Sequence, residues 1–528
     1  MAETAARPED LTQSGPRPSG LSGVAAAAVA LGVAQLTAVA FGPSADSRTA
    51  IGSTVIDLTP GPVKEWAIQT FGTSDKLFLT VAVLVVIAVI AACTAQFETR
   101  RRPVGSIAIV LAGLAGCAAV LSRTGATALD VVPTLLGTGC GVLVLRLLIS
   151  GRFTDQTSPT EPTPTPPDGD APDRGRRLSL VTLGFIGAGA LAGVAGTVLN
   201  RLNSSVSGDR EAFTPPTITR SLPPPPPAVQ PAGVALPSFV TANDDFYRID
   251  TALSVPQLSR TAWQLRIHGM VDREIVYRFD DLAKLELVEA MVTLTCVSNP
   301  VGGDLIGNAV WTGYRVRDLL AAAGIHPDAD MVMSTSIDGF TAGTPVEALT
   351  DDRDAILAIT MNGQPLPIEH GYPARLVVPG LYGYVSATKW IVDLEVTRFD
   401  RAEAYWTALG WAARGPIKTQ SRVDVPKSGQ VVPAGPVRFG GVAWAQHRGL
   451  NGVEVQIDDD PWQPAQLGAS YNDDTWRLWS FDWQAGEPGT HQIAVRATDK
   501  TGAVQTSDKA DVIPDGATGW HTVSFTVK

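Results

Sequence analysis

One cysteine of this 528-residue chain stands outside its long apolar stretches, and its neighbours suggest chemistry. Cys296 follows Thr293-Leu-Thr and precedes Val-Ser-Asn299-Pro-Val-Gly-Gly. The pattern predicts a strand that ends at the cysteine and opens into a polar, glycine-bearing loop. A thiolate at such a place can act as a nucleophile or as a ligand for a soft metal. The alternative is an inert, buried cysteine.

A second stretch carries basic side chains at turns that flank an apolar strand. Residues 370–380 read His-Gly-Tyr-Pro-Ala-Arg-Leu-Val-Val-Pro-Gly, and Ser386-Ala-Thr-Lys389-Trp follows. His370, Arg375 and Lys389 could converge on an anion, because arginine offers a planar fork and lysine a point charge, which suits a phosphate. The alternative is three solvated surface cations.

Two soluble domains must position these residues. From 237 to 412 we expect a mixed α+β domain, with strands near 263–267 and 374–378 and a helix at 316–323. GxGxxG and P-loop motifs are absent from the sequence, so a nucleotide cofactor lacks its usual site.

From 413 to 528 the sequence predicts an all-β, immunoglobulin-like sandwich. Alternating segments at 437–444, 452–457, 476–483, 491–498 and 521–527 are separated by turn signals. Such a module commonly joins subunits, and we expect its tryptophans to be core and interface aromatics.

The first part of the chain predicts a membrane anchor at 21–200, after a cytoplasmic tail at 1–20. About five apolar runs are long enough to cross a bilayer: 21–41, 77–95, 104–121, 128–149 and 180–199. A cleaved signal peptide is the alternative for the first run.

Arginines give the orientation of these spans. They cluster at Arg100–Arg102 and around a Pro/Thr-rich loop at 152–177, which places both regions in the cytoplasm. Everything after residue 200 then lies outside, so we expect a multi-pass protein of the cell membrane with extracytoplasmic C-terminal domains. Arg176-Arg177 resembles a twin-arginine export signal, with a positive-inside pair as the alternative. A Pro-rich linker at 201–236 should form a stiff spacer.

The net charge and the residue counts argue against several kinds of partner and cofactor site. A formal net charge of −11 argues against nucleic acid as a partner. All six histidines lie at position 268 or later, so the membrane part cannot hold a bis-histidine haem. CxxC is absent, which removes the usual structural zinc site.

Several motifs together resemble the molybdopterin domain of sulfite oxidases. These are Phe246-Tyr-Arg248-Ile-Asp250, Leu-Thr-Cys296-Val-Ser-Asn299, Trp311-Thr-Gly313, Met361-Asn-Gly-Gln-Pro-Leu-Pro367, the 370–380 block and Lys389-Trp390. The β region around Trp476-Arg477-Leu-Trp479 is similar to that family's C-terminal dimerisation domain, which implies a possible homodimer.

The resemblance implies a molybdenum held by one molybdopterin and by the thiolate of Cys296. His370, Arg375, Ser386 and Lys389 would hold the pterin and its phosphate. Asn299 would orient the ligand loop, and Arg248 would sit near the oxyanion of the substrate. No haem domain is attached, so electrons would pass to a separate cytochrome or quinone-linked partner.

Two departures from the family pattern bear on the substrate. Pro300-Val301 stands where sulfite oxidases carry arginines, and Trp411 stands where they carry an active-site tyrosine. We expect oxidation of sulfite or a related sulfur compound. The alternatives are reduction of an S-oxide or N-oxide, such as oxidised methionine, and a membrane-tethered interaction module without activity.

Overall fold

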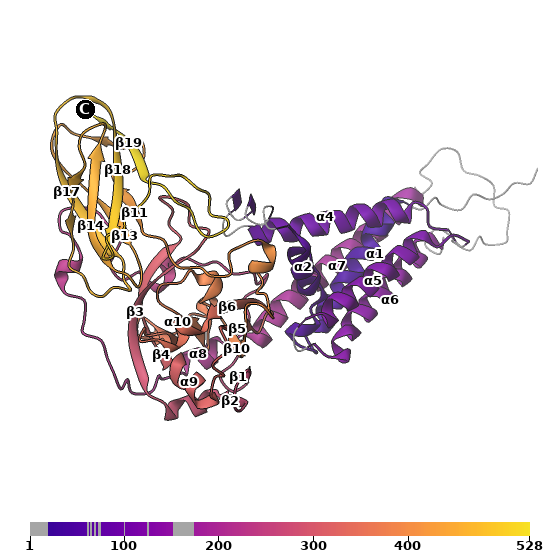
Figure 1. Ribbon diagram of the computed structural model, residues 1–528. Coiled ribbons are helices and arrows are strands. Elements are labelled where there is room, and N and C mark those ends of the chain that lie inside the picture. The colour runs from indigo at the N-terminus through magenta and orange to yellow at the C-terminus, as the bar shows by residue number, and fades with distance from the viewer. Residues whose placement is uncertain are drawn as a thin grey trace, which may run out of the picture. The chain divides into compact units, whose positions relative to one another are not determined.

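The computed structural model describes residues 19–60, 63, 66–67, 70–71, 75–99, 101–123, 126–150 and 174–528. They fall into two compact units, Met1–Ser205 and Val206–Lys528. Figure 1 labels the main helices of the first unit and many of the helices and strands of the second. Most of the expected tail 1–20 lies outside the described residues. So do Arg100, the expected loop 152–177 up to residue 173, and the side chains of Arg176 and Arg177.

The first unit is helical. Its longer helices are α1 (Gly20–Ala38), α2 (Ser47–Leu58), α4 (Asp75–Ala95), α5 (Val104–Leu121), α6 (Val132–Ile149) and α7 (Arg174–Ser204). Within the described residues, five segments are long and apolar enough to cross a membrane: Gly20–Ala38, Lys76–Ala95, Val104–Leu121, Ala128–Ile149 and Leu178–Glu211. Each overlaps one of the five expected spans.

Small residues let the central helix approach its neighbours. α1 packs against α4, α6 and α7. A Cβ atom at Gly32 would collide with the backbone of Gly189, and one at Gly23 with the backbone of Ala91. Large apolar side chains, such as Leu77, Val81 and Val85 of α4, point outward. This is the arrangement expected of helices that meet lipid rather than water.

The second unit begins with α8 (Ser207–Glu211) and contains an antiparallel sheet and a mixed sheet. One has the order β3-β4-β7-β8, with β9 paired to β7; the other has the order β2-β1-β10-β5-β6. The strands of the first sheet are β3 (Leu287–Thr295), β4 (Ile306–Arg315), β7 (Ile356–Met361), β8 (Gln364–Pro365) and β9 (Arg375–Val377). Those of the second are β1 (Gln264–Gly269), β2 (Ile275–Arg278), β5 (Met331–Ser336), β6 (Thr341–Pro345) and β10 (Ile391–Thr397). The helices α9 (Val316–Ala323) and α10 (Val346–Thr350) belong to the same part.

Two further sheets form the C-terminal sandwich, a name we use for residues 420–527. The orders are β11-β13-β17-β16 and β12-β19-β18-β14-β15. The strands of the first are β11 (Gln420–Val425), β13 (Gly435–Trp444), β16 (Gln466–Leu467) and β17 (Arg477–Ala485). Those of the second are β12 (Val431–Val432), β14 (Leu450–Ile457), β15 (Gln463–Pro464), β18 (Gly489–Asp499) and β19 (His521–Val527). Phe439 and Trp479 from one sheet share a buried core with Val455, Val495 and Phe525 from the other.

The expected spacer at 201–236 differs from the structure. From Val206 onward this segment belongs to the second unit. Phe213 and Val229 are buried, and Leu222 donates its N–H to Glu289 at 2.8 Å. Tyr471 donates to the carbonyl of Pro223 at 2.6 Å. A proline-rich chain is extended and leaves its carbonyls unpaired, so it can lie along a protein surface instead of standing free.

Candidate functional site

Cys296 lies directly after β3, at the start of a short closed loop. Its N–H donates to Leu305 O at 3.0 Å, which continues the pairing of β3 with β4 by one residue. Asn299 closes the loop, because its N–H donates to Cys296 O at 3.2 Å and its Oδ1 accepts from Leu305 N at 3.0 Å. Cys296 is not in a disulfide and is partly exposed. The chain therefore presents this thiol from a closed loop, whose two ends Asn299 links.

Two tyrosines lie close enough to Cys296 for a charge on its sulfur to change the pKa of their hydroxyl groups. Burial raises the pKa of Tyr247 well above its usual range, and a Cys296 thiolate raises it further. Burial raises the pKa of Tyr382 to about 12, with a smaller contribution from Cys296. Both phenols therefore stay protonated at neutral pH. The sequence analysis assigned no role to Tyr247, although it stands beside Arg248 in the motif that was quoted.

Arg375 is a buried cation. Its side chain lies over the ring of Trp311, with the guanidinium carbon 5.0 Å from the ring centroid. It donates only to backbone carbonyls, those of His370 at 3.2 Å and of Leu376 and Ala387 at 3.4 Å. Burial lowers its pKa to about 10, so it remains charged at neutral pH. In the described part of the chain no carboxylate forms an ion pair with it, which leaves a buried charge without a counter-ion.

Lys389 and Arg248 meet on one carboxylate. Lys389 Nζ and Arg248 Nε each lie 2.9 Å from Asp250 Oδ2, and the Asp250 side chain is 3% exposed. Burial lowers the pKa of Lys389 to about 8, although Asp250 counters this effect. The side chain of Arg248 is one-third exposed. Asp250, two residues after Arg248, had no predicted role although it ends the motif Phe246–Asp250.

His370 sits between these cations as a neutral ring. Burial, with Arg375 and Lys389 adding to it, lowers the pKa of His370 to about 3. Its Nε2 donates to Asn243 O at 3.2 Å, so Nδ1 is left as an acceptor. Gly371 makes the approach possible: its φ is +111°, and a Cβ there would lie 3.0 Å from Arg375 Cβ and 3.1 Å from Lys389 Cβ. The structure thus brings His370, Arg375, Lys389 and Arg248 together.

Ser386 and Trp411 lie outside this charged group. The Ser386 hydroxyl is fully buried and donates to Tyr382 O at 2.9 Å. Trp411 is buried among aromatic rings, 5.8 Å from the centroid of Tyr384 and 6.1 Å from that of Trp406. Ser386 therefore fixes the backbone that follows Tyr382, and Trp411 packs against the neighbouring Tyr384.

Comparison with known proteins identifies relatives of this chain. Residues 252–406 match the family model of the oxidoreductase molybdopterin binding domain. The chain is 28% identical to the mitochondrial sulfite oxidase of Mus musculus over 323 residues, which cover 52% of this chain and 58% of that protein. It is 32% identical to the oxidoreductase YuiH of Bacillus subtilis (strain 168) over 155 residues, which cover 29% of this chain and 75% of that protein.

A solved structure, the sulfane dehydrogenase SoxCD from Paracoccus pantotrophus, aligns with a TM-score of 0.48 and 23% identity, covering 55% of this chain and 82% of that one. The chain spans little more than half the length of the mouse and rat sulfite oxidases that it matches. The match to YuiH covers most of that protein at substantial identity. The residues matched by the family model, 252–406, include Cys296, Arg375 and Lys389. This chain belongs to the sulfite oxidase family of molybdopterin-dependent oxidoreductases.

Proposed function

We propose that this chain is a molybdenum-pterin oxidoreductase that transfers an oxygen atom to or from a sulfur compound. The observation that supports this most is the pairing of two features. A partly exposed thiol, Cys296, is held on a braced loop, and Arg375 is a buried cation that lacks a counter-ion among the described residues. A soft ligand suits molybdenum, and an uncompensated buried cation suits an anionic group that the chain itself does not supply.

The residues fit one molybdopterin with its phosphate. Cys296 would supply the thiolate ligand, and Arg375 with Lys389 would hold the phosphate. The unprotonated Nδ1 of neutral His370 would accept from an N–H of the pterin ring rather than bind the phosphate, because it has no proton to donate. When bound, the cofactor supplies the oxygen-atom and two-electron chemistry. Asn299 would keep the ligand loop closed, while Ser386 acts through the backbone at Tyr382.

Sulfite is the first candidate substrate, with Arg248 as the residue that meets its charge. The exposed third of the Arg248 side chain leaves donors available beyond the bond from Nε to Asp250. Tyr247 remains protonated near Cys296, so it keeps an O–H that can donate to an oxygen of the substrate.

The reduction of an S-oxide or N-oxide is the second candidate, and one observation favours it. Asp250 takes one bond each from Arg248 and Lys389, so its negative charge cancels part of the positive charge of the site. If the cofactor phosphate then uses Arg375 and Lys389, little net positive charge is left for a small dianion. An uncharged S-oxide does not need a positively charged site.

The setting of the enzyme is also part of the proposal. Five apolar helices favour a multi-pass anchor in the cell membrane, and the positions of the arginines favour an extracytoplasmic second unit. Electrons would then pass one at a time between the site and a separate cytochrome or quinone-linked partner. The C-terminal sandwich would suit a homodimer.

Metal and pterin content of the purified chain tests the proposal. Wild type and Cys296→Ser would be made in a host that synthesises the cofactor, then assayed with sulfite and with methionine sulfoxide. We expect near-stoichiometric molybdenum in wild type, and a loss of activity of at least about a thousandfold in Cys296→Ser, as for removal of a group that binds the reacting centre. Well-folded wild type without molybdenum would reject the oxidoreductase in favour of a tethered interaction module.

A further inference from the structure

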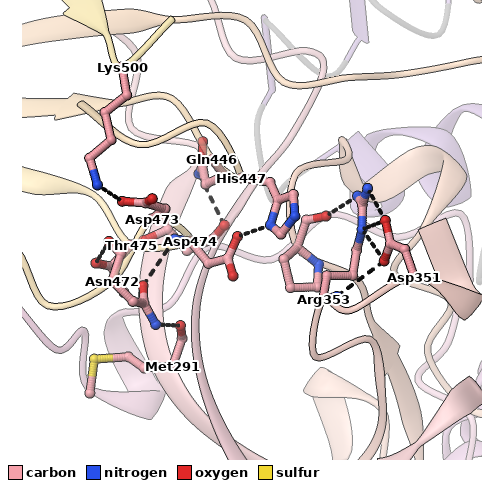
Figure 2. A network of polar contacts seen from close by, with 12 residues as sticks. Met291, Asp351, Arg353, Gln446, His447, Asn472, Asp473, Asp474, Thr475 and Lys500 are labelled. Atoms are coloured by element: carbon pink, nitrogen blue, oxygen red, sulfur yellow. Dashed lines mark hydrogen bonds and ion pairs between the residues drawn. The ribbon is translucent and has the colours of Figure 1, made fainter. Parts of the chain in front are cut away.

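The C-terminal sandwich is hydrogen-bonded to the strand that leads to Cys296. Gln446, two residues after β13, donates through Nε2 to Thr293 O and to Thr295 Oγ1, both at 3.0 Å. All three residues are buried. Figure 2 shows Gln446 in the polar network between the two domains, with His447 and residues 472–475 close by. One sandwich side chain therefore holds the last three residues before the cysteine.

A second loop of the sandwich covers the outer edge of the same strand. β3 is the terminal strand of its sheet, and the start of its outer edge is covered by an isolated bridge between Val288 and Arg220. The sandwich covers the later part of this edge. There Thr293 N donates to Asp474 O at 2.9 Å, and Trp476 N donates to Thr293 Oγ1 at 2.8 Å. Asn472 Nδ2 donates to Met291 O at 3.1 Å, as Figure 2 also shows. The sandwich thus supplies the hydrogen bonds that a neighbouring strand would otherwise make.

The far end of the cysteine loop is held by the sandwich as well. Arg422 of β11 donates through Nη1 to Gly303 O at 2.7 Å. The ring of His521, at the start of β19, lies so close to Gly302 that a Cβ atom there would collide with it. Gly302 has a φ of +79°, which already favours glycine. Both ends of the segment 296–303 are therefore fixed by residues from another domain.

Strand geometry relates these contacts to the thiol. Side chains alternate along a strand, so Thr293 and Thr295 face the sandwich while Cys296 faces the opposite side. The groups that hold β3 are thus separate from those that meet the cofactor or the substrate. We propose that the C-terminal sandwich is a working part of the metal site, and that Gln446 is a positioning residue that sets where the Cys296 thiolate lies. This inference rests on the proposed function, because it takes Cys296 as the metal ligand.

Gln446→Met gives a clean test of the positioning role. Methionine has nearly the same length but no donor, and Gln446 Oε1 is buried without a partner among the described residues, so little else is lost. We expect unchanged molybdenum content, with a shifted thiolate-to-metal absorption band and altered Mo(V) electron paramagnetic resonance. We expect kcat to fall about tenfold with KM within about twofold, since a small misplacement of a reacting group costs up to about a hundredfold.

Two further variants make the test decisive. Gln456→Met is the matched control, because that side chain donates only within the sandwich, to Asp460 O at 2.8 Å, and should leave spectra and kcat unchanged. Thr295→Val removes one of the two acceptors of Gln446 and keeps the other; it should shift the same spectra in the same direction, and it carries the test if Gln446→Met fails to fold.

The outcomes separate this inference from the proposed function. Molybdenum in wild type, with Gln446→Met and Thr295→Val matching the wild-type spectra and kcat, would overturn the positioning role alone. Equal effects of Gln446→Met and Gln456→Met would also overturn it, since the cause would then be general damage to the sandwich. Absence of molybdenum from wild type would instead overturn the proposed function.

Discussion

Arg375 is a cation whose only bonds within the described chain go to backbone carbonyls at 3.2–3.4 Å. Taking a charge out of water costs several kcal/mol unless a counter-ion offsets this desolvation penalty. Such a residue weakens the cofactor-free fold and gains its partner only when an anion binds. Removing the Arg375 charge should therefore make the cofactor-free protein more stable and should lower its retention of the cofactor.

Arg375→Met tests this opposition. In a host that cannot make molybdopterin, the variant should unfold at a higher temperature than wild type, with a gain of about 1–2 kcal/mol from removing an unpaired buried charge. In a host that makes the cofactor, it should retain little or no molybdenum. Thermal unfolding and metal analysis of the two preparations measure both effects. Arg477→Met is the control, because Arg477 also donates to carbonyls, those of Gly468 and Leu450, and should leave metal content unchanged. A less stable Arg375→Met that keeps its metal would contradict the prediction.

Asp250 should decide how the site treats charged substrates. Asp250→Asn keeps an acceptor for Lys389 and Arg248 but removes the negative charge. We expect KM for sulfite to fall about three- to tenfold, as for the loss of a like charge near an anion, and KM for dimethyl sulfoxide to change less than about twofold. The assay should be run near pH 6. Lys389 has a pKa of about 8, which Asp250 helps to raise, and the lower pH keeps Lys389 charged in the variant as well.

A matched variant separates local charge from general effects on the domain. Asp393→Asn removes a carboxylate that pairs with His268 at 3.0 Å between β1 and β10. It should leave both KM values unchanged. If Asp250→Asn lowers both KM values alike, or neither, the carboxylate does not discriminate between substrates by charge.

At the scale of elements, β19 and β11 share a histidine that must stay neutral. Val423 N donates to His521 Nδ1 at 3.0 Å, so that nitrogen carries no proton in the fold. Burial and the nearby Arg422 lower the pKa of His521 to about 4. Between about pH 6.5 and pH 4 the unfolded chain binds a proton that the folded chain does not, so stability is present above pH 6.5 and is lost as pH falls.

His521→Gln should remove this acid-side loss. The melting temperature of the detergent-solubilised wild type should fall as the pH is lowered from 6.5 to 4. In His521→Gln this fall should be smaller, because the variant avoids a loss in the free energy of unfolding on the order of 1 kcal/mol, a figure discounted for the partial exposure of the ring. His491→Gln provides the opposite sign. Asp458 raises the pKa of His491, so its contribution is present below about pH 6.5 and is lost at higher pH. Parallel curves for wild type and His521→Gln would contradict the assignment.

Elements were more predictable from the sequence than contacts between them. The helix at 316–323 and the strand at 521–527 were predicted with their observed bounds, because apolar spacing reports burial within one element. The predicted strands at 263–267 and 476–483 begin one residue early and end two residues short, where turn and strand propensities are similar. The docking of 206–236 had no periodic signal, since its contacts run through backbone carbonyls such as Pro223 O.

The proximity of the basic residues was predictable because their side-chain chemistry is distinctive, while their roles toward a cofactor stay predictions. His370, Arg375 and Lys389 do converge, as their types and the flanking turns suggested. Asp250 and Tyr247 were missed because a carboxylate and a phenol in a loop read as ordinary surface residues until the fold buries them beside cations or a thiol. Gln446 lies 150 residues after Cys296 in the chain, and no local pattern links the two.

At the scale of the whole molecule, the spans and the arginines together predict which side carries the second unit. Helices α1, α4, α5 and α6 precede Ser150, and α7 follows the loop after it. If each of the five candidate segments crosses once, Ser150 and Lys528 lie on opposite sides. By the positive-inside tendency, Arg101, Arg102 and Arg146 predict that the Ser150 side faces the cytoplasm.

Reporter fusions after Ser150 and after Lys528 test this topology directly. A phosphatase that folds only outside the cytoplasm should be active after Lys528 and inactive after Ser150, and a fluorescent protein that matures only inside should give the reverse. Wild type should resist extraction by alkaline carbonate, because five spans hold it far more strongly than surface binding does. Phosphatase activity at neither position would mean that α7 returns without crossing. Activity at Ser150 alone would invert the topology, place the second unit in the cytoplasm, and remove the need for export of a folded, cofactor-loaded domain.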